Sequence, residues 1–183
     1  MKQARLGNPQ AVEALVAANA NAAFTLAMRI LRHRENAEET VQDAFIKAFG
    51  ALHRFRGESR FSTWLHRIVY TTALNRAARK EPMLYNVDHP GLAENDMGAT
   101  TEQFNTLELA DRQHYTSLAL GKLAPEERGL LVLHYYEDKP LAEVAEIAGL
   151  TRANVKVKLY RARQKMAHEL KALLGDELPI WKS

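Results

Sequence analysis

Residues 141–161 read LAEVAEIAGLTRANVKVKLYR, and their spacing fits a helix-turn-helix motif. Ala145 is a small residue at the point where the two helices would touch, and Gly149 stands at the turn, where a positive φ is needed. Thr151 can cap the second helix. Two apolar residues can fill the space between the helices, Leu150 and Val155. The stretch therefore predicts a helix-turn-helix, with a plain pair of helices joined by a glycine turn as the alternative.

The second helix of this motif carries six cations and no acid up to Met166. They are Arg152, Lys156, Lys158, Arg161, Arg163 and Lys165. A helix that only covers a core usually alternates the sign of its charges, because like charges at helical spacing repel each other. Either an anion lies against this helix or the bias is accidental.

The two faces of this helix favour the first option. At about 100° per residue, one stripe is apolar and is predicted to be core: Val155, Leu159, Ala162, Met166 and Leu170. The opposite face, inside a ring of lysines, consists of Ala153, Val157, Tyr160, Arg161 and Gln164. Cations suit phosphates, while Val157, Tyr160 and Arg161 suit base edges and thymine methyl groups. The pattern predicts a recognition helix in the major groove of DNA.

The composition is that of an ordinary soluble protein. The 183 residues suffice for one domain or two small ones, and 46% of them are hydrophobic and 26% charged. The chain has no cysteine, which excludes disulfides, thiolate metal sites and thiol redox sensing. Its first residues lack the apolar run of a signal peptide, and the run LLVL at 130–133 is too short to span a bilayer. We expect a soluble cytoplasmic protein.

The net charge of +3 is distributed unevenly along the chain. The segment 81–111 contains seven acids and neither Lys nor Arg, whereas the rest of the chain carries all 25 bases. The first part of this segment also has prolines and glycines without periodicity, as a mobile linker does. Two basic domains around an acidic connector suggest surfaces that face nucleic acid and a connector that avoids it. A solvated linker of accidental sign is the alternative.

Helical periodicity fills the rest of the chain, and no strand-like alternation occurs. One helix is predicted to start at Asn36 as its cap, with Glu39 in the capping-box position. Its predicted buried residues are Val41, Phe45, Ala48, Phe49 and Leu52. Gly57 provides a turn, and a further helix is predicted from near Ser59 to about Lys80.

Beyond the connector, helix is predicted to resume near Thr106. Pro125 and Pro140 mark two helix starts, because proline suits the start of a helix and the acids after each proline suit the positive end of the helix dipole. The prediction is an all-α fold of two small helical domains joined by a flexible acidic linker. The predicted segments are a first domain at 1–80, the linker at 81–105, a second domain at 106–175 and a C-terminal tail at 176–183.

A second constellation lies in the stretch FRGESRFSTWLHRIVYTTALNRAARK, which starts at Phe55. Arg67, Thr71 and Asn75 follow one another at four-residue steps along one line of a helix. Two aromatic residues precede this line, Phe61 and Trp64, and three cations extend the charge, Arg76, Arg79 and Lys80. Aromatic rings beside hydrogen-bonding side chains can hold an unstacked base of a single strand. Core packing of the two rings is the alternative, and Phe55 is predicted to be core in either case.

The motifs occur in the order ENAEETVQDAFIKAFGAL, FRGESRFSTWLHRI, an acidic linker and LAPEERGLLVLHYYEDKPLAEVAEIAGLTRANVKVKLYRARQKM. In this order, over nearly the whole chain, the sequence resembles a bacterial extracytoplasmic-function (ECF) sigma factor of the sigma-70 family. The resemblance implies that the first domain binds the clamp helices of the β′ subunit of core RNA polymerase and opens the minus-10 promoter element. The second domain would bind the β flap and read the minus-35 element. The implied function is that of an alternative sigma factor, which directs core polymerase to specific promoters.

The resemblance also assigns roles by position. The core-polymerase contact would be made by Ala37, Glu38, Glu39, Val41, Gln42, Asp43 and Phe45. The minus-10 reader with its flipped-base pocket would be formed by Arg56, Gly57, Glu58, Ser59, Arg60, Phe61, Trp64, Arg67, Thr71 and Asn75. The minus-35 reader would use Arg152, Ala153, Asn154, Lys156, Val157, Tyr160, Arg161 and Lys165. Promoter DNA is therefore an expected partner, and an anti-sigma factor is a further candidate.

Two residues depart from the family pattern: Thr71, where many members have Asn, and Val157, where Ser is common. The captured base and the minus-35 sequence therefore do not follow from the resemblance. The seven His residues form no HExxH motif, and we expect neither a metal, a cofactor nor a catalytic site. The alternative function is a two-domain helix-turn-helix regulator that binds an operator without polymerase.

Overall fold

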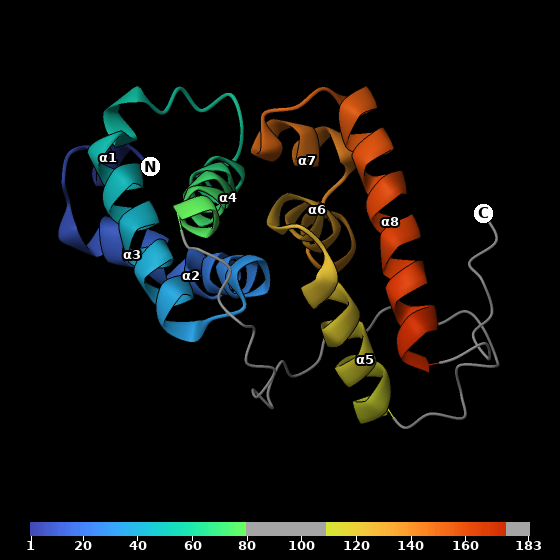
Figure 1. Cartoon of the computed structure of the whole chain (residues 1–183). Coiled ribbons are helices and arrows are strands. Elements are labelled where there is room, and N and C mark those ends of the chain that lie inside the picture. The colour runs from blue at the N-terminus through green and yellow to red at the C-terminus, as the bar shows by residue number, and fades with distance from the viewer. Residues whose placement is uncertain (80–108, 175–183) are drawn as a thin grey trace.

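The structure, a computed structural model, describes residues 1–79 and 109–174, and all regular structure in these ranges is helical. The N-terminal group consists of α1 (Lys2–Arg5), α2 (Pro9–Leu31), α3 (Arg34–Gly50), the 3₁₀ turn η1 (Leu52–Arg54) and α4 (Phe61–Arg79). The C-terminal group consists of α5 (Leu109–Lys122), α6 (Pro125–Leu131), the π-helical turn η3 (Val132–Tyr136), α7 (Leu141–Ala148) and α8 (Arg152–Leu174). Figure 1 shows the two groups side by side, and the predicted all-α fold is confirmed. The predicted linker at 81–105, the predicted helix start near Thr106 and the tail at 176–183 lie outside the described residues.

Prolines open two of the C-terminal helices, as predicted. Pro125 is the first residue of α6, and the Glu127 carboxylate accepts a hydrogen bond from the backbone N–H of Ala124 (3.2 Å). Pro140 is the N-cap of α7. Both helices have acids in their first turn, where the positive end of the helix dipole favours them.

The start of α3 differs from the prediction. The helix begins at Arg34 with His33 as its cap, not at Asn36, and Asn36 is buried inside the first turns. Burial of Asn36 in the helix packing outweighs its tendency to cap, and Glu35 supplies an acid at the positive helix end. Of the residues predicted to be buried, Phe45, Ala48 and Leu52 are buried, while Val41 and Phe49 are half-buried.

The helix-turn-helix consists of α7, the turn at Gly149 and α8. Gly149 has a φ of 69°, and the N–H of Leu150 donates to the carbonyl of Ala145 (3.0 Å). The Thr151 hydroxyl accepts from a backbone N–H in the first turn of α8 (3.2 Å) and so caps this helix. Val155 is fully buried. The motif predicted from the sequence is therefore present.

Each group of helices is packed internally. In the N-terminal group, α2, α3 and α4 pack against one another and bury Leu26, Ile30 and Val69. In the C-terminal group, α8 packs against α5, α6 and α7. The predicted core stripe of α8 is confirmed, because Val155, Leu159, Ala162 and Leu170 are buried and Met166 is half-buried.

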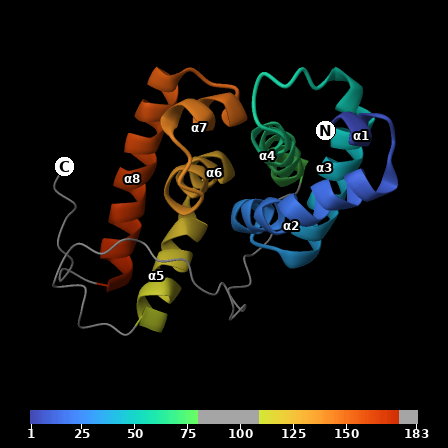
Figure 2. The same ribbon diagram turned by 180° about the vertical axis from the view of Figure 1, so that it is seen from behind.

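The two groups also pack against each other, α4 against α7 and α2 against α6 (Figure 1 and Figure 2). Arg128 of α6 is only 1% exposed, and its guanidinium donates to the carbonyls of Ile30 and Leu123, both at 2.8 Å. A buried charge is tolerated only when it is well hydrogen-bonded. Arg128 therefore fastens the end of α2 to the corner between α5 and α6.

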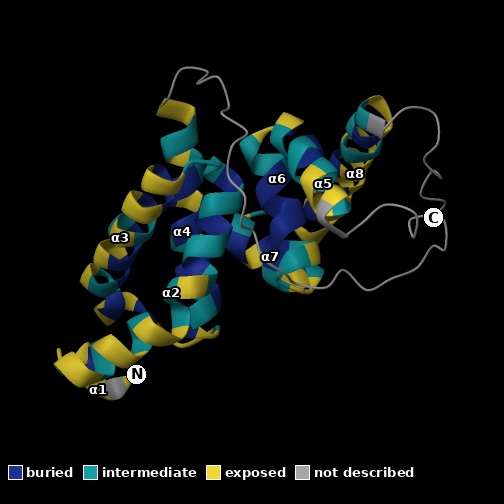
Figure 3. Cartoon of the chain, turned by 90° about the horizontal axis from the view of Figure 1, so that it is seen from below, coloured by how far each residue is buried: buried dark blue, intermediate teal, exposed yellow. Residues whose placement is uncertain are grey.

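Further contacts join the two groups of helices. Gly129 lies directly against Tyr70 of α4, since a Cβ atom at Gly129 would come within 2.6 Å of the Tyr70 ring. Thr63 of α4 donates a hydrogen bond to Glu143 of α7 (2.9 Å). Figure 3 shows buried residues in dark blue where α4, α6 and α7 meet. The apolar core is continuous across both groups.

By length and composition alone, α2 could cross a membrane. Polar residues such as Asn19, Asn21 and Arg29 interrupt its sequence, so no long apolar run marks it. It packs against α3, α4 and α6 and buries Ala23, Leu26, Ala27 and Ile30. The core helix of a globular domain meets the same length and composition criteria.

Candidate nucleic-acid interface

The outward face of α8 is exposed, as its pattern predicts. Val157 and Tyr160 are 48% and 55% exposed, and Arg161 is exposed beside them. The helices α5, α6 and α7 cover the opposite side of α8. Large apolar side chains that remain exposed within a basic surface are available to a partner such as the edges of base pairs.

The cations of α8 fall into two classes that the sequence does not distinguish. Lys158 lies 3.1 Å from Glu126, and Lys165 pairs with Glu127, both in the first turn of α6. The other four have no ion-pair partner among residues 1–79 and 109–174, and one of them, Arg163, donates a hydrogen bond to the Tyr135 hydroxyl (3.1 Å); the remaining three are Arg152, Lys156 and Arg161. Glu126 and Glu127 therefore neutralise only part of the positive charge of α8.

Arg67, Thr71 and Asn75 are exposed along one line of α4, as their spacing predicts. The Thr71 hydroxyl donates to the carbonyl of Arg67 (2.8 Å), so only its oxygen lone pairs remain for a base. The side chain of Asn75 makes no hydrogen bond within the described ranges and keeps donors and acceptor free. Asn75 is the better equipped of the two to bind a base edge.

The aromatic residues at the start of α4 form a cluster with Phe55. Phe61 is 9% exposed, and its ring centroid lies 6.0 Å from that of Phe55 and 5.8 Å from that of the half-buried Trp64. Tilted and edge contacts of this kind stabilise a core. Phe55 is buried as predicted, and the position of Phe61 agrees with the alternative of core packing. The Phe61 ring would have to leave this cluster to stack on a base.

The loop before α4 is exposed around a glycine turn. Gly57 has a φ of 78°, which suits its predicted role. Arg56 and Glu58 lie 3.8 Å apart with exposed side chains, and such a pair contributes about 0–1 kcal/mol. Arg60 is exposed and Ser59 half-buried. The polar side chains of this loop are therefore free to meet a nucleic-acid strand.

The polar side of α3 presents the acids of the predicted polymerase contact. Glu38, Glu39 and Gln42 are exposed, and Asp43 is half-buried. The apolar members of the predicted contact are buried or half-buried: Ala37, Val41 and Phe45. Phe45 stacks on Phe49 with ring centroids 5.9 Å apart. A partner that docks on this side of α3 would contact the four polar residues, and the apolar residues pack beneath them.

Ile46 is a candidate contact residue that the sequence analysis missed. It is 72% exposed and lies one turn after Gln42 on the same side of α3. An aliphatic side chain outside the buried stripe of a helix was the signal available in the sequence. Ile46 adds an exposed apolar group to the polar side of α3.

Arg76 of α4 connects the two N-terminal surfaces. Its guanidinium lies 2.9 Å from Asp43 and also pairs with Glu39, both on α3. Asn75 is its neighbour in the sequence. The pattern places Arg76 among the cations that extend the charge of α4, whereas the structure shows it paired with two acids of the predicted polymerase contact.

His66 is buried on α4 where the two groups of helices meet. Burial lowers the pKa of His66, and the charge of Lys139 acts in the same direction. Partial burial opposes ionisation of Glu143, but hydrogen bonds from Lys139 and Thr63 outweigh it and lower the pKa of Glu143. The contact therefore favours a neutral imidazole and an ionised carboxylate.

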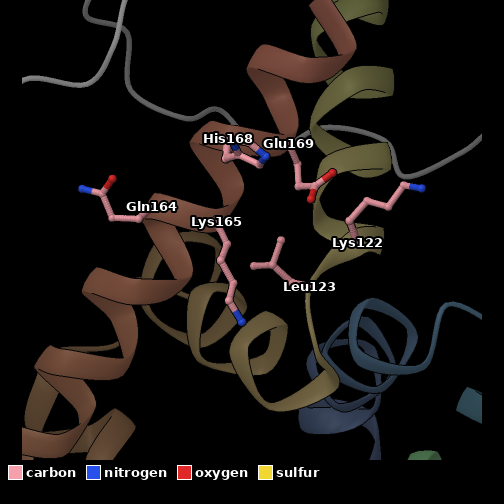
Figure 4. A pocket seen from close by; sticks show the side chains of 6 residues that line it. All are labelled: Lys122, Leu123, Gln164, Lys165, His168 and Glu169. Carbon is pink, nitrogen blue, oxygen red and sulfur yellow. The ribbon is translucent and has the colours of Figure 1, made fainter.

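A shallow groove of about 470 Å³ lies between α5 and α8 (Figure 4). Its lining consists of Lys122, Leu123, Gln164, Lys165, His168 and Glu169. The polar side chains among these are exposed or half-buried, so none is held in place for a small ligand. Among the described residues, no cluster of three His, Asp or Glu could hold a metal ion.

Comparison with known proteins agrees with this arrangement. Residues 15–82 match the family model of sigma-70 region 2, and residues 114–166 match that of sigma-70 region 4. The chain is 26% identical to the ECF RNA polymerase sigma factor SigW of Bacillus subtilis (strain 168), over 94% of this chain and 96% of the relative. It is 29% identical to the ECF RNA polymerase sigma-E factor of Escherichia coli (strain K12), over 74% of each chain. The solved structure of CnrH in complex with the cytosolic domain of CnrY resembles this one with a TM-score of 0.66 and 26% identity, over 93% of this chain and 94% of CnrH.

These matches follow the order of the structural groups. Region 2 covers most of α2 and all of α3 and α4, while region 4 covers most of α5, the helix-turn-helix and the exposed face of α8. The predicted family is confirmed: the chain belongs to the ECF sigma factors of the sigma-70 family.

Proposed function

We propose that this chain is an alternative sigma factor that directs core RNA polymerase to specific promoters. Residues 1–80 would bind the core enzyme and open the minus-10 element, and residues 106–175 would read the minus-35 element. A flexible acidic linker at 81–105 would join these two domains, and a tail at 176–183 would follow the second one. The main support is that two exposed recognition faces, on α4 and α8, occur in one chain in the order of regions 2 and 4.

The minus-35 element is assigned to the outward face of α8. Val157, Tyr160 and Arg161 would contact base edges, because they lie at the centre of the exposed face. Arg152 and Lys156, which have no ion pair within the described ranges, would contact phosphates. Of the remaining candidates, Ala153 lies on the same face, and Asn154 and Lys165 lie at its margin.

The minus-10 element is assigned to α4 and the loop before it. Arg67, Thr71 and Asn75 would line the pocket for a flipped base, with the loop at 56–60 against the strand. Phe61 and Trp64 would act through the aromatic cluster, which fixes the loop to the start of α4. Asn75 would carry most of the base recognition, since the Thr71 hydrogen is already used within the helix.

The core-polymerase contact is assigned to the exposed side of α3. Glu38, Glu39, Gln42 and Asp43 would form its polar part, and Ile46 would supply an apolar anchor. Interface energy concentrates in a few such residues. Val41 and Phe45 would support the contact by packing beneath it. The β flap would bind the C-terminal domain, as the family assignment implies.

The remaining parts of the proposal follow from this role. The chain would act in the cytoplasm, where it would supply recognition while the polymerase supplies the chemistry, without a cofactor of its own. CnrH, a similar protein, is bound by the cytosolic domain of CnrY in its solved structure. A protein that holds this chain away from polymerase, an anti-sigma factor, is therefore a proposed partner.

Transcription from a randomised promoter library with purified core polymerase tests the proposed function. With the chain added, transcripts should come from templates that share two short elements at a fixed spacing. Core enzyme without the chain should not select them. Absence of selection, combined with specific DNA binding by the chain alone, would support the operator-binding alternative instead.

A further inference from the structure

We propose that Arg76 exchanges partners when the chain joins polymerase. In the free chain Arg76 holds Glu39 and Asp43 of α3. Core polymerase would take these two acids with a cation of its own and release Arg76 to a phosphate of the minus-10 DNA. This inference rests on the proposed function, because it names how the polymerase surface and the DNA surface of the same domain communicate.

The geometry of the pair suits an exchange. Arg76 bridges two carboxylates that lie one helical turn apart, which uses the fork of its guanidinium. The side chains are 21% exposed for Arg76, 62% for Glu39 and 48% for Asp43. The two carboxylates are open to solvent although the guanidinium is largely covered, so a partner that docks on α3 can reach both of them.

Electrostatics disfavours a state in which both cations share the acids. Glu39 and Asp43 lie on the side of α3 that carries Gln42 and Ile46, where the polymerase contact is assigned. A polymerase cation placed there would stand close to the Arg76 guanidinium, and like charges repel. Removal of Arg76 relieves this repulsion and leaves both carboxylates to the partner.

The released side chain has an anion within its range. Arg76 directly follows Asn75, which lies on the exposed DNA-facing line of α4, and Arg79 continues the line one turn further. A long, flexible arginine at this place can turn from α3 toward the strand that Asn75 contacts. A phosphate there would accept two hydrogen bonds from the guanidinium.

Exchange couples the two binding events. If polymerase binding frees Arg76 and so raises the affinity for DNA by some factor, then DNA that binds Arg76 must raise the affinity for polymerase by the same factor. A brace that only held α3 and α4 together would produce no such coupling. Comparison of core affinity with and without promoter DNA therefore distinguishes exchange from bracing.

The test measures binding of the full-length chain to core polymerase, and of the resulting holoenzyme to a promoter duplex over a salt series. Arg76→Gln should bind core about threefold to fivefold more tightly, the effect expected from a freed surface pair. The salt slope of holoenzyme binding to the promoter should fall by about one, as for one lost phosphate contact. Promoter DNA should also raise core affinity less for Arg76→Gln than for wild type. Lys122→Gln removes one positive charge from an exposed site outside the assigned surfaces and should leave both core affinity and the salt slope unchanged.

Arg76→Lys separates the two halves of the exchange and serves if Arg76→Gln fails to fold. Lysine keeps the positive charge but cannot bridge the two carboxylates as the forked guanidinium does. Core affinity should therefore rise while the salt slope stays near the wild-type value. Weaker or unchanged core binding by these folded variants would overturn the exchange and identify Arg76 as a brace. A wild-type chain that does not bind core polymerase would overturn the proposed function itself, and the inference with it.

Discussion

The helices α4 and α8 both carry an exposed line of candidate DNA-reading residues, but their surroundings differ. α8 packs mainly against α5, α6 and α7 of its own group, whereas α4 packs against α2 and α3 and also against α6 and α7 of the other group. On α4 the exposed Arg67 and Thr71 directly follow the buried His66 and Tyr70. A shift between the two groups would therefore change the surroundings of the α4 line and leave the outer face of α8 intact.

This difference suggests that the two surfaces do different work. The face of α8 is complete within one domain and suits docking on a duplex. The face of α4 borders the turn of the helix-turn-helix, where a Cβ atom on Gly149 would lie 3.7 Å from Arg67. Minus-10 recognition would therefore depend on how the two domains are placed, and core polymerase would fix that placement.

The largest expected effect comes from the arginine that joins the groups. Arg128→Ala removes two hydrogen bonds from a buried guanidinium and leaves the carbonyls of Ile30 and Leu123 without this donor. The free energy of unfolding should fall by roughly 2–5 kcal/mol in urea titrations. Hydrogen exchange should rise more in α4 and α7 than along the outer part of α8. Arg34→Ala removes an exposed pair with Glu38 and should change stability by less than about 0.5 kcal/mol. Equal losses from both variants would show that the groups are not joined through Arg128.

Asn75→Ala tests the α4 surface directly. A held base offsets an unstacking cost of roughly a few kcal/mol, so loss of Asn75 should slow open-complex formation on duplex promoters. Templates already unpaired at the minus-10 element should be affected much less. Fluorescence of a base analogue at that element follows the opening. An equal defect on both templates would mean that Asn75 does not act in strand opening.

Arg161→Ala and Lys165→Ala test the α8 surface. Arg161 should contact a base edge, and its loss should cost about 1–3 kcal/mol and relax preference at one minus-35 position. Lys165 is partly neutralised by Glu127, so its loss should weaken all sequences alike and lower the salt slope by about one at most. Binding to matched and mismatched minus-35 duplexes over a salt series measures both effects. Identical, sequence-independent losses would place the whole helix on the DNA backbone.

The smallest expected effect is a pH dependence of the contact between the groups. The pKa of His66 lies below its ordinary value near 6.5 while the groups are packed, so the packed form binds fewer protons than the separated form. The stabilisation is therefore present above about pH 6.5 and is lost as the pH falls toward the lowered pKa. Glu143 acts in the same direction only at more acid pH, because its pKa lies below its ordinary value near 4.5.

Small-angle scattering between pH 7.5 and 5.5 measures this effect. The groups charged near His66 from the facing elements are Lys139, Glu137 and Glu143. The wild-type chain should expand on acidification, and His66→Asn should not show the pH-dependent part. A His66→Asn variant that expands as the wild type does would assign the titration to another group.

Features defined by residues close in sequence were predictable. The turn at Gly149, the buried stripe of α8 and the exposed line of α4 all follow from helical spacing within one segment. Contacts between segments far apart in the chain were not predictable, because no local pattern encodes which segments approach each other. Examples are the ion pairs of Arg76 with α3 and of Lys158 with Glu126, and the burial of Arg128. The prediction that Asn36 caps α3 was wrong because the capping pattern depends only on neighbouring residues, whereas Asn36 is buried by packing against the rest of the fold.

The affinity of the chain for a library-selected promoter duplex, measured with and without core polymerase at fixed salt, tests the joint action of α4 and α8 most directly. We predict weak, salt-sensitive binding with little sequence preference for the chain alone. Once core enzyme is present, we predict tight, sequence-specific binding, because polymerase places the α4 and α8 surfaces on the two elements together. Nanomolar, sequence-specific binding by the chain alone would contradict this prediction and identify an operator-binding regulator.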